Sequence, residues 1–169
     1  LFNVYFDHLT ICENTVKDFL IVKPKVSIGL ENIVGICVLP EVNLSFGLMS
    51  GWRHQFGTEI WQAPAGFVEA GEDPSKTALR ELREETSLVC EPKNLISLGS
   101  FIPDAGLIEG KVGLFLAKDC KFISQEKTNE VGTGEVHYFN ANQLMKLICN
   151  NSNLGGSTIT ASLRALQYY

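Results

Sequence analysis

The sequence lacks an apolar run long enough to cross a membrane, and it lacks an excess of positive charge. Its longest apolar stretches, such as Ile33 to Leu39, are far shorter than the roughly 18 to 20 residues that a membrane-spanning helix requires. The formal net charge is −5 and the pI is near 5.2, whereas non-specific nucleic-acid binding depends on a basic surface. These features predict a protein with no membrane span and no nucleic-acid partner.

The cysteines show no pairing motif. The five cysteines are far apart, and there is no Cys-x-x-Cys pair to indicate a zinc or redox site. Buried, reduced thiols in a cytoplasmic protein are the simplest interpretation. The chain begins at Leu1 rather than Met, which leaves open whether further residues or a targeting peptide precede it.

The length and composition are those of one globular domain. The chain has 169 residues, of which 45% are apolar and 20% are charged. We therefore expect a single domain, 1–169, whose residues 1–32 form an N-terminal antiparallel β unit. Strand-sized apolar segments separated by turn residues predict strands at 2–6, 19–22, 33–39, 44–49, 59–62, 95–102, 112–117 and 136–139.

Helix signals begin in the middle of the chain. Asp73 is a good N-cap and Pro74 suits the first helical position, which predicts a helix that ends near Thr86. Two further helices are expected at 142–148 and 158–167, and a polar loop at 118–134. The expected apolar stripe of the last helix consists of Ile159, Leu163 and Leu166.

Negative charge is concentrated between residues 66 and 91, where seven acidic and three basic residues give a balance of 3 − 7 = −4. On the predicted helix, Glu81, Glu84 and Glu85 emerge on one face and repel one another, and Arg80 offsets part of this by pairing with Glu84. Carboxylate oxygens suit Mg²⁺ or Mn²⁺, which can bridge a diphosphate. The alternative for such a charge run is a solvated helix face.

Eight residues at fixed spacing resemble the Nudix box, G-x5-E-x7-R-E-U-x-E-E-x-G-U, in which U is aliphatic. The matching residues are Gly66, Glu72, Arg80, Glu81, Leu82, Glu84, Glu85 and Leu88. One position differs, because Ser87 stands where the box has its second glycine and must tolerate a helix-end geometry that glycine adopts easily. The resemblance implies the Nudix fold, an α/β (α+β) architecture with a mixed β-sheet sandwiched between helices.

The resemblance also implies a hydrolase of nucleoside diphosphates linked to another moiety, acting with two or three Mg²⁺ or Mn²⁺ ions. The implied metal ligands are the Ala65 carbonyl and the carboxylates of Glu81, Glu84 and Glu85, with Glu84 sharing a metal or a bridging water. Arg80 would orient these glutamates. Glu72 would hold the loop that begins at Gly66 to the helix.

The segments that flank the box resemble those of ADP-ribose pyrophosphatases and related nucleotide-sugar hydrolases. They are WRHQFGTEIWQAPAG before the box and PDAGLIE after it. The substrate-binding candidates are Trp52, Arg53, Trp61, Gln62, Pro103, Gly106 and Glu109. Arg53 would clamp a phosphate, and either Trp would stack on a base or sugar or else pack in the core. Gln62 replaces a glutamate common in relatives, which keeps GDP-mannose or another hexose nucleotide as an alternative substrate.

The resemblance to ADP-ribose enzymes implies a general base on a late loop, where a flexible donor suits a site that must close over its substrate; residues 125–139 offer Glu126, Glu130 and Glu135. Glu130 is the first candidate and Glu135 the second, and a base on the helix is the alternative; Glu84 and Arg80 complete the expected catalytic set. The resemblance implies a homodimer that cleaves ADP-ribose or a nucleoside diphosphate sugar to a nucleoside monophosphate and a sugar phosphate. A non-catalytic module that senses nucleotide sugars is the alternative from another class.

Overall fold

The computed structural model describes residues 2–25, 32–123 and 134–169. Its centre is a mixed sheet in the order β11-β4-β3-β9-β8, with β5 added to β4 and β6 added to β3. Of these pairings, β3 with β9 is parallel and the others are antiparallel. The strands are β3 (Ile33–Val42), β4 (Ser45–Arg53), β5 (Thr58–Gln62), β6 (Ala65–Phe67), β8 (Leu95–Phe101), β9 (Lys111–Ala117) and β11 (Val136–Asn140).

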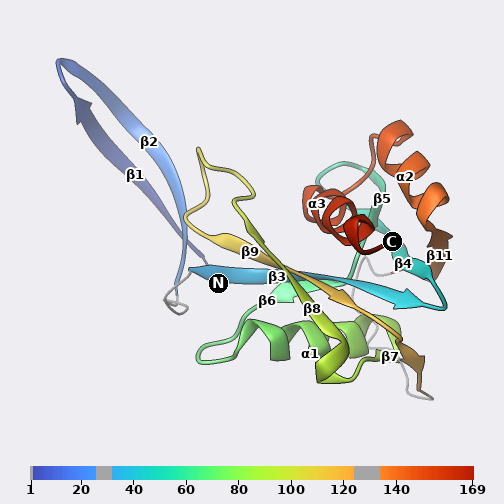
Figure 1. The fold of residues 1–169 in the computed structure, drawn as a ribbon. Helices are drawn as coiled ribbons and strands as arrows, with labels where there is room; N and C mark the ends of the chain where they lie inside the picture. Colours follow the sequence, from blue (N-terminus) through green and yellow to red (C-terminus); the bar gives the residue numbers. More distant parts are fainter. Residues whose placement is uncertain (1, 26–31, 124–133) are drawn as a thin grey trace.

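Helices cover both faces of this sheet (Figure 1). They are α1 (Pro74–Thr86) on one face, and α2 (Ala141–Asn150) and α3 (Gly156–Ala165) on the other. The two-residue period of β3 separates the cores, because Val38 packs with Leu82 of α1, whereas Cys37 and Leu39 pack with Ala161 of α3. The predicted α/β architecture, a mixed sheet between helices, is confirmed.

The N-terminal antiparallel unit is also confirmed, although its strands are longer than predicted. β1 (Phe2–Ile11) and β2 (Asn14–Pro24) form a separate two-stranded sheet, which projects from the rest of the protein in Figure 1. Its base is tied to the segment between β8 and β9: the Val22 N–H donates to the Leu107 carbonyl at 2.8 Å, and the Glu109 N–H donates to the Val22 carbonyl at 2.9 Å.

Helix α1 begins and ends where the sequence predicts. The Asp73 side chain accepts the Ser75 N–H at 2.8 Å, and Pro74 occupies the first turn. At the other end, Ser87 adopts the left-handed conformation, with φ 57° and ψ 24°, and its N–H donates to the Arg83 carbonyl. The non-glycine residue therefore accepts the geometry that the sequence pattern assigns to glycine.

This geometry predicts a stability difference between two variants of Ser87. The free energy of unfolding of Ser87→Gly should be about 1 kcal/mol higher than that of Ser87→Ala. Both variants lose the hydroxyl, but only glycine adopts the left-handed conformation without a steric penalty from Cβ. Urea unfolding of the two variants measures the difference. Equal stabilities would contradict the assigned helix end.

Two short strands correct the loops predicted from the sequence. Gly66, expected to open a glycine-bounded loop, lies in β6, which pairs with β3 through Ile36. Within the predicted loop 118–134, β10 (Lys121–Phe122) pairs with β7 (Leu88–Val89). Strands of two or three residues are too short to show a period, so only the partner strand reveals them. Residues 124–133, which include Glu126 and Glu130, lie outside the described residues.

The apolar stripe predicted for the last helix is confirmed at Leu166, which packs against the core, and wrong at Leu163. Leu163 is 44% exposed, and the side chains of α3 that are buried are Thr158, Ala161, Ser162 and Ala165. Small residues let α3 approach the sheet closely, and Thr158 accepts the Ala63 N–H at 2.9 Å. Close packing of these small side chains, rather than a full stripe of large apolar side chains, holds α3 against the sheet.

The prediction of buried thiols holds for only part of the set. Cys37 and Cys120 are buried, Cys90 is partly buried, and Cys12 and Cys149 are exposed; all five are free thiols. Burial raises the pKa of Cys37 to about 12, so this thiol is inert at neutral pH. None of the helices in the described part of the chain is both long and apolar enough to cross a membrane.

Candidate active site

Three carboxylates lie on neighbouring parts of one face of α1, and two of them, Glu81 and Glu85, meet β6. Glu81 and Glu85 are buried, with 8% and 6% of their surfaces exposed, and Glu84 is partly exposed. Glu85 accepts the Ala65 N–H at 3.1 Å. Buried carboxylates are rare unless they are paired or coordinate metals, so this cluster is the strongest candidate site in the described residues.

Gly66 permits the close approach of helix and strand. A Cβ atom built at Gly66 would lie 1.9 Å from Oε1 of Glu81 and 2.1 Å from its Cδ. The backbone of β6 is fixed here by its pairing with β3, in which Gly66 lies opposite Ile36. The Glu81 carboxylate therefore occupies the space that any other side chain at position 66 would fill.

Arg80 connects the acidic residues to one another. Its Nη1 lies 2.7 Å from Oε1 of Glu81 and 3.2 Å from Oε2 of Glu84, so the predicted pairing with Glu84 is confirmed. Its Nη2 lies 3.2 Å from Oε2 of Glu72 and donates to the Phe67 carbonyl at 3.3 Å. The hydrogen bond with Glu72 is the main cause of the raised pKa of Arg80. The Arg80 guanidinium thus pairs with three carboxylates and also donates a hydrogen bond to the carbonyl at the end of β6.

The Arg80 hydrogen bond lowers the pKa of Glu72 from 4.5 to about 2. Ionised Glu72 therefore stabilises the fold fully above about pH 4.5, and this contribution is lost as the pH falls toward 2. Glu72→Gln should lower the free energy of unfolding at pH 7 by on the order of 1 kcal/mol, because the pair is partly exposed to solvent. Urea unfolding from pH 7 to 2 should show the two proteins converging in stability below pH 4.5. A constant difference would contradict this assignment.

The donor chemistry of the cluster fits Mg²⁺ or Mn²⁺. Nowhere in the described residues are three His, Cys, Asp or Glu side chains grouped tightly enough to hold a metal ion on their own. Mg²⁺ does not require such a cage, since it binds through one or two carboxylates and takes its other ligands from water and substrate phosphates. The buried oxygens of Glu81 and Glu85, beside the peptide groups of β6, supply donors of that kind.

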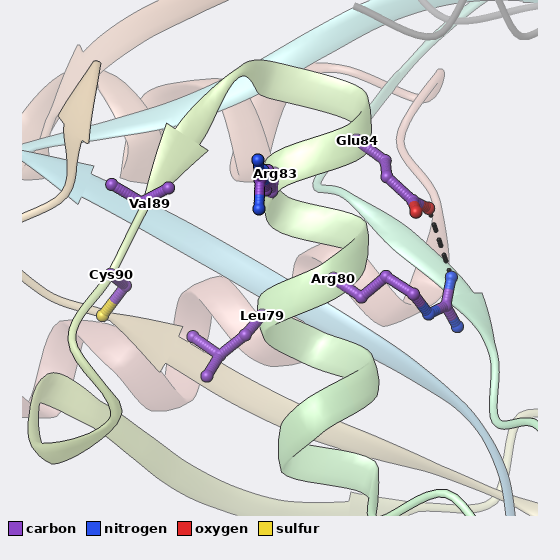
Figure 2. Close-up of a pocket in the computed structure, with 6 residues that line it drawn as sticks. All are labelled: Leu79, Arg80, Arg83, Glu84, Val89 and Cys90. Carbon is purple, nitrogen blue, oxygen red and sulfur yellow. Dashed lines mark hydrogen bonds and ion pairs between the residues drawn. The ribbon is translucent and has the colours of Figure 1, made fainter. Parts of the chain in front are cut away.

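A cavity of about 440 Å³ lies on the outer side of α1, between the helix and the segment that follows it. Figure 2 shows Arg80 and Glu84 extending to one side of α1, and Leu79 and the Val89–Cys90 segment on the other. Arg83 completes the lining. The sequence contains no signal for this cavity, because it depends on how β7 returns beside the helix.

The substrate-binding candidates before the box lie on β4 and β5. Nε of Arg53 donates to Oε1 of Gln62 at 3.1 Å, and Nη2 donates to the same oxygen. Trp61 makes edge contacts with the rings of His137 and Phe139, at 5.2 and 5.4 Å, and packs against the core. Trp52 is 55% exposed. Of the two tryptophans, Trp52 thus offers the more open ring.

The candidates after the box lie in the segment between β8 and β9, which contacts β2. Glu109 forms an ion pair with Lys23 at 2.8 Å, Pro103 is exposed, and the Gly106 N–H donates to Oδ1 of Asp104. The ion-pair partner of Glu109 therefore comes from the N-terminal hairpin.

Of the two candidates for the general base, only Glu135 lies within the described residues. Glu130 lies outside the described residues. Glu135 is exposed and immediately precedes β11, whose first residue pairs with Met49 of β4. A Cβ atom at the neighbouring Gly134 would lie 1.7 Å from the Ser50 carbonyl oxygen, so this segment runs tightly along β4.

Three contacts at the site were not predicted from the sequence. The Ala65 N–H binds Glu85, the Phe67 carbonyl accepts from Arg80, and Cys90 lines the cavity beside α1. The first two depend on the pairing of β6 with β3, and the third on the pairing of β7 with β10. Such contacts follow from strand register, which the sequence pattern does not show.

Comparison with known proteins identifies relatives of the chain. A model of the NUDIX domain matches residues 33–152. An ADP-ribose pyrophosphatase from Mycobacterium tuberculosis is 34% identical over 109 residues, 64% of this chain and 48% of that protein. A CMP-5'-(N-acetyl-N-hydroxy-3-aminopropyl)phosphonate hydrolase from Streptomyces rubellomurinus is 37% identical over 74 residues, 43% of this chain and 35% of that protein. The chain thus spans half or less of the length of these relatives.

A solved structure shares the fold along nearly the whole chain. The crystal structure of an ADP compounds hydrolase superposes with a TM-score of 0.80, covering 99% of this chain and 86% of that one, at 16% sequence identity. At this identity the likeness concerns the fold. Because the NUDIX model covers more than half of the chain and the residues of its characteristic box gather at α1 and β6, the chain belongs to the Nudix hydrolase family.

Proposed function

We propose that this protein hydrolyses the diphosphate bond of ADP-ribose or a nucleoside diphosphate sugar, yielding a nucleoside monophosphate and a sugar phosphate. The observation that carries the proposal is the pair of buried carboxylates, Glu81 and Glu85, held against the backbone of β6 beside Gly66. The similarity to an ADP-ribose pyrophosphatase supports the substrate class.

The residues that would hold two or three Mg²⁺ or Mn²⁺ ions are Glu81, Glu85, Glu84 and the Ala65 carbonyl. Bound metal ions would neutralise the diphosphate and make a water a better nucleophile. The protein's own contribution is to fix the ligands. Arg80 restrains the carboxylates of Glu81 and Glu84 through Nη1 and reaches Glu72 through Nη2, so the helix face is ordered before substrate arrives.

Arg53 would bind a phosphate of the substrate. A guanidinium carries five N–H donors in a fixed plane, and Gln62 accepts from only the Nε and Nη2 edge. Gln62 would thereby orient Arg53 without neutralising its charge, whereas a glutamate there would form an ion pair with it. Trp52, exposed on the preceding position of β4, would stack on the base or sugar, and Trp61 is the alternative.

We propose Glu130 as the general base, with Glu135 as the second candidate. The test is the pH profile and kcat of Glu130→Gln and Glu135→Gln. The variant that lacks the true base should have a kcat lower by about 10²-fold or more. Its plot of kcat against pH should also lack the limb that reports the ionisation of the base. Full kcat in Glu130→Gln would move the assignment to Glu135, and full kcat in both would move it to a residue of the helix.

A second candidate function is favoured by Gln62, which departs from the acidic residue common in ADP-ribose enzymes. This departure fits a specialist for GDP-mannose or another hexose nucleotide. Pro103, Gly106 and Glu109, in the segment that contacts β2, would then select the distal sugar. A sensor module without turnover is a third reading, which the complete set of acidic residues on α1 disfavours.

A substrate panel distinguishes these functions. The protein would be incubated with Mg²⁺ and, separately, ADP-ribose, ADP-glucose, GDP-mannose and UDP-glucose, and released sugar phosphate would be detected by coupled phosphatase. Preferred turnover of ADP-ribose supports the first reading, and preferred turnover of a hexose nucleotide supports the second. Binding of a panel member without turnover would overturn both and favour the sensor.

We also propose that residues 1–169 act as one domain and that the N-terminal unit, 1–32, mediates a homodimer. An isolated two-stranded hairpin is only marginally stable in water. Val4 and Phe6, 59% and 65% exposed, lie on one face of β1, opposite Val22 and Leu20 of β2. A second copy would cover this apolar face.

Phe6→Asp should convert the dimer to a monomer, because it places a charge in the centre of this face. Size-exclusion chromatography with light scattering measures the mass. Phe56→Asp, which changes another phenylalanine that is 72% exposed in the β4–β5 turn, is the matched control and should leave the dimer intact. A dimer that survives Phe6→Asp would contradict the proposal.

A further inference from the structure

Cys90 and Cys120 face each other across two short strands. In the antiparallel pairing of β7 with β10, Val89 lies opposite Lys121. The next position outward on each strand is a cysteine, so this register places Cys90 opposite Cys120. Directly opposed residues of an antiparallel pair have Cα atoms roughly 4.5 to 5.5 Å apart. This spacing falls within the range that a disulfide can bridge.

The thiols themselves converge on the same turn. The Cys90 thiol donates to the Lys118 carbonyl at 3.4 Å, and the Cys120 thiol donates to the Ala117 carbonyl at 3.2 Å. The side chain of Cys90 therefore reaches across the strand pair to the chain that carries Cys120. The interaction between the two neighbouring thiols is the main cause of a lowered pKa at Cys90 and a raised pKa at Cys120.

The two thiols differ in accessibility. Cys90 is partly buried and lines the cavity beside α1, together with the apolar side chains of Leu79 and Val89 and the cationic Arg83 (Figure 2). Cys120 is only 5% exposed. A reagent entering the cavity would meet Cys90 first, and the lower pKa gives Cys90 the larger thiolate fraction.

We propose that Cys90 is a site of reversible thiol–disulfide exchange, with Cys120 as the resolving thiol and a low-molecular-weight disulfide such as oxidised glutathione as the co-reactant. The Cys90 thiolate attacks one sulfur of the reagent, forming a mixed disulfide and releasing one small thiol. Cys120 loses its proton and attacks the Cys90 sulfur, forming the protein disulfide and releasing the second small thiol. The reagent is reduced to two thiols, and the two protein thiols are oxidised to one disulfide.

The disulfide would join the two chain segments just beyond α1. Cys90 follows the helix end at Ser87 by three residues, and the Ser87 carbonyl already accepts the Ile123 N–H at 3.0 Å. Oxidation would therefore reinforce an existing contact rather than create a new arrangement. The proposal concerns the thiols alone and does not depend on the substrate of the hydrolase.

Peptide mapping tests the proposal. A Cys12→Ser/Cys149→Ser variant removes the two exposed thiols and leaves three of the five cysteines. This protein would be treated with oxidised glutathione, alkylated under denaturing conditions and digested with trypsin without reduction. The expected product is a linked pair of peptides, 84–93 and 119–121, and the number of alkylated thiols should fall from three to one. Dithiothreitol should restore all three.

Single substitutions assign the order of the steps. In the same background, Cys120→Ser should accumulate the glutathione adduct on Cys90, because the resolving thiol is absent. Cys90→Ser should leave Cys120 unmodified in the folded protein. The proposal is overturned if the parent variant keeps three alkylated thiols, or if it retains a stable glutathione adduct on Cys90 while Cys120 remains a free thiol.

Discussion

Glu85→Gln is expected to reduce metal-dependent turnover of a nucleotide sugar by about 10³-fold or more, since a metal ion supplies several kcal/mol of transition-state stabilisation. The amide keeps an oxygen that can accept the Ala65 N–H, which Glu85 now binds at 3.1 Å. The fold should therefore persist while the charged ligand is lost. Steady-state kinetics with Mg²⁺ measure the loss of turnover. Calorimetric titration with Mn²⁺ measures the loss of the charged ligand as weaker metal binding.

Glu91→Gln is the matched control for this experiment. It makes the same chemical change in the same acidic segment, but Glu91 is exposed and its carboxylate forms an ion pair with the nearby Lys93, at 2.8 Å. We expect its turnover and Mn²⁺ affinity to stay within about twofold of wild type, because exposed ion pairs contribute little. Near-normal activity in Glu85→Gln would refute its role as a metal ligand.

Gly66→Ala is expected to reduce turnover by about 10²-fold or more while leaving the protein folded. The new methyl group would lie 1.9 Å from Oε1 of Glu81, and a flexible carboxylate moves more easily than the paired backbone of β6. Glu81 would therefore swing away from its position, and a small displacement of a catalytic group is enough to cost this much. Thermal unfolding should show a loss of roughly 1–3 kcal/mol from overpacking.

Gly156→Ala controls for the loss of a glycine. A Cβ atom at Gly156, the first residue of α3, would meet no heavy atom within 4 Å, so its turnover should match that of wild type. A crystal structure of Gly66→Ala should show the Glu81 carboxylate displaced. Wild-type turnover in Gly66→Ala would show that the position of Glu81 does not control the reaction.

Local signals made the acidic helix predictable. Asp73 and Pro74 set its start, and the fixed spacing of the acidic residues identified the family and the pairing of Arg80 with Glu84. These features need only the contacts of one helix turn, so a single sequence contains them. The same holds for β3, which was predictable as a strand from its continuous apolar run.

Features that depend on distant segments were not predictable in the same way. Gly66 is recognisable as a motif residue, but the reason for it, the Glu81 carboxylate against β6, appears only once β6 is paired with β3. The facing positions of Cys90 and Cys120 likewise depend on the register of two strands too short to show a pattern. The packing of α3 was mispredicted because small residues, rather than Leu163, meet the sheet.

The central claim is that the carboxylates of α1 support metal-dependent cleavage of a diphosphate. The most direct measurement is the hydrolysis of ADP-ribose by the wild-type protein as Mg²⁺ is titrated, with AMP and ribose 5-phosphate resolved by chromatography. We predict that both products form in equal amounts, that their rate rises with Mg²⁺ to saturation, and that EDTA abolishes it. Hydrolysis that proceeds equally well in EDTA, or that gives products from cleavage outside the diphosphate, would contradict the claim.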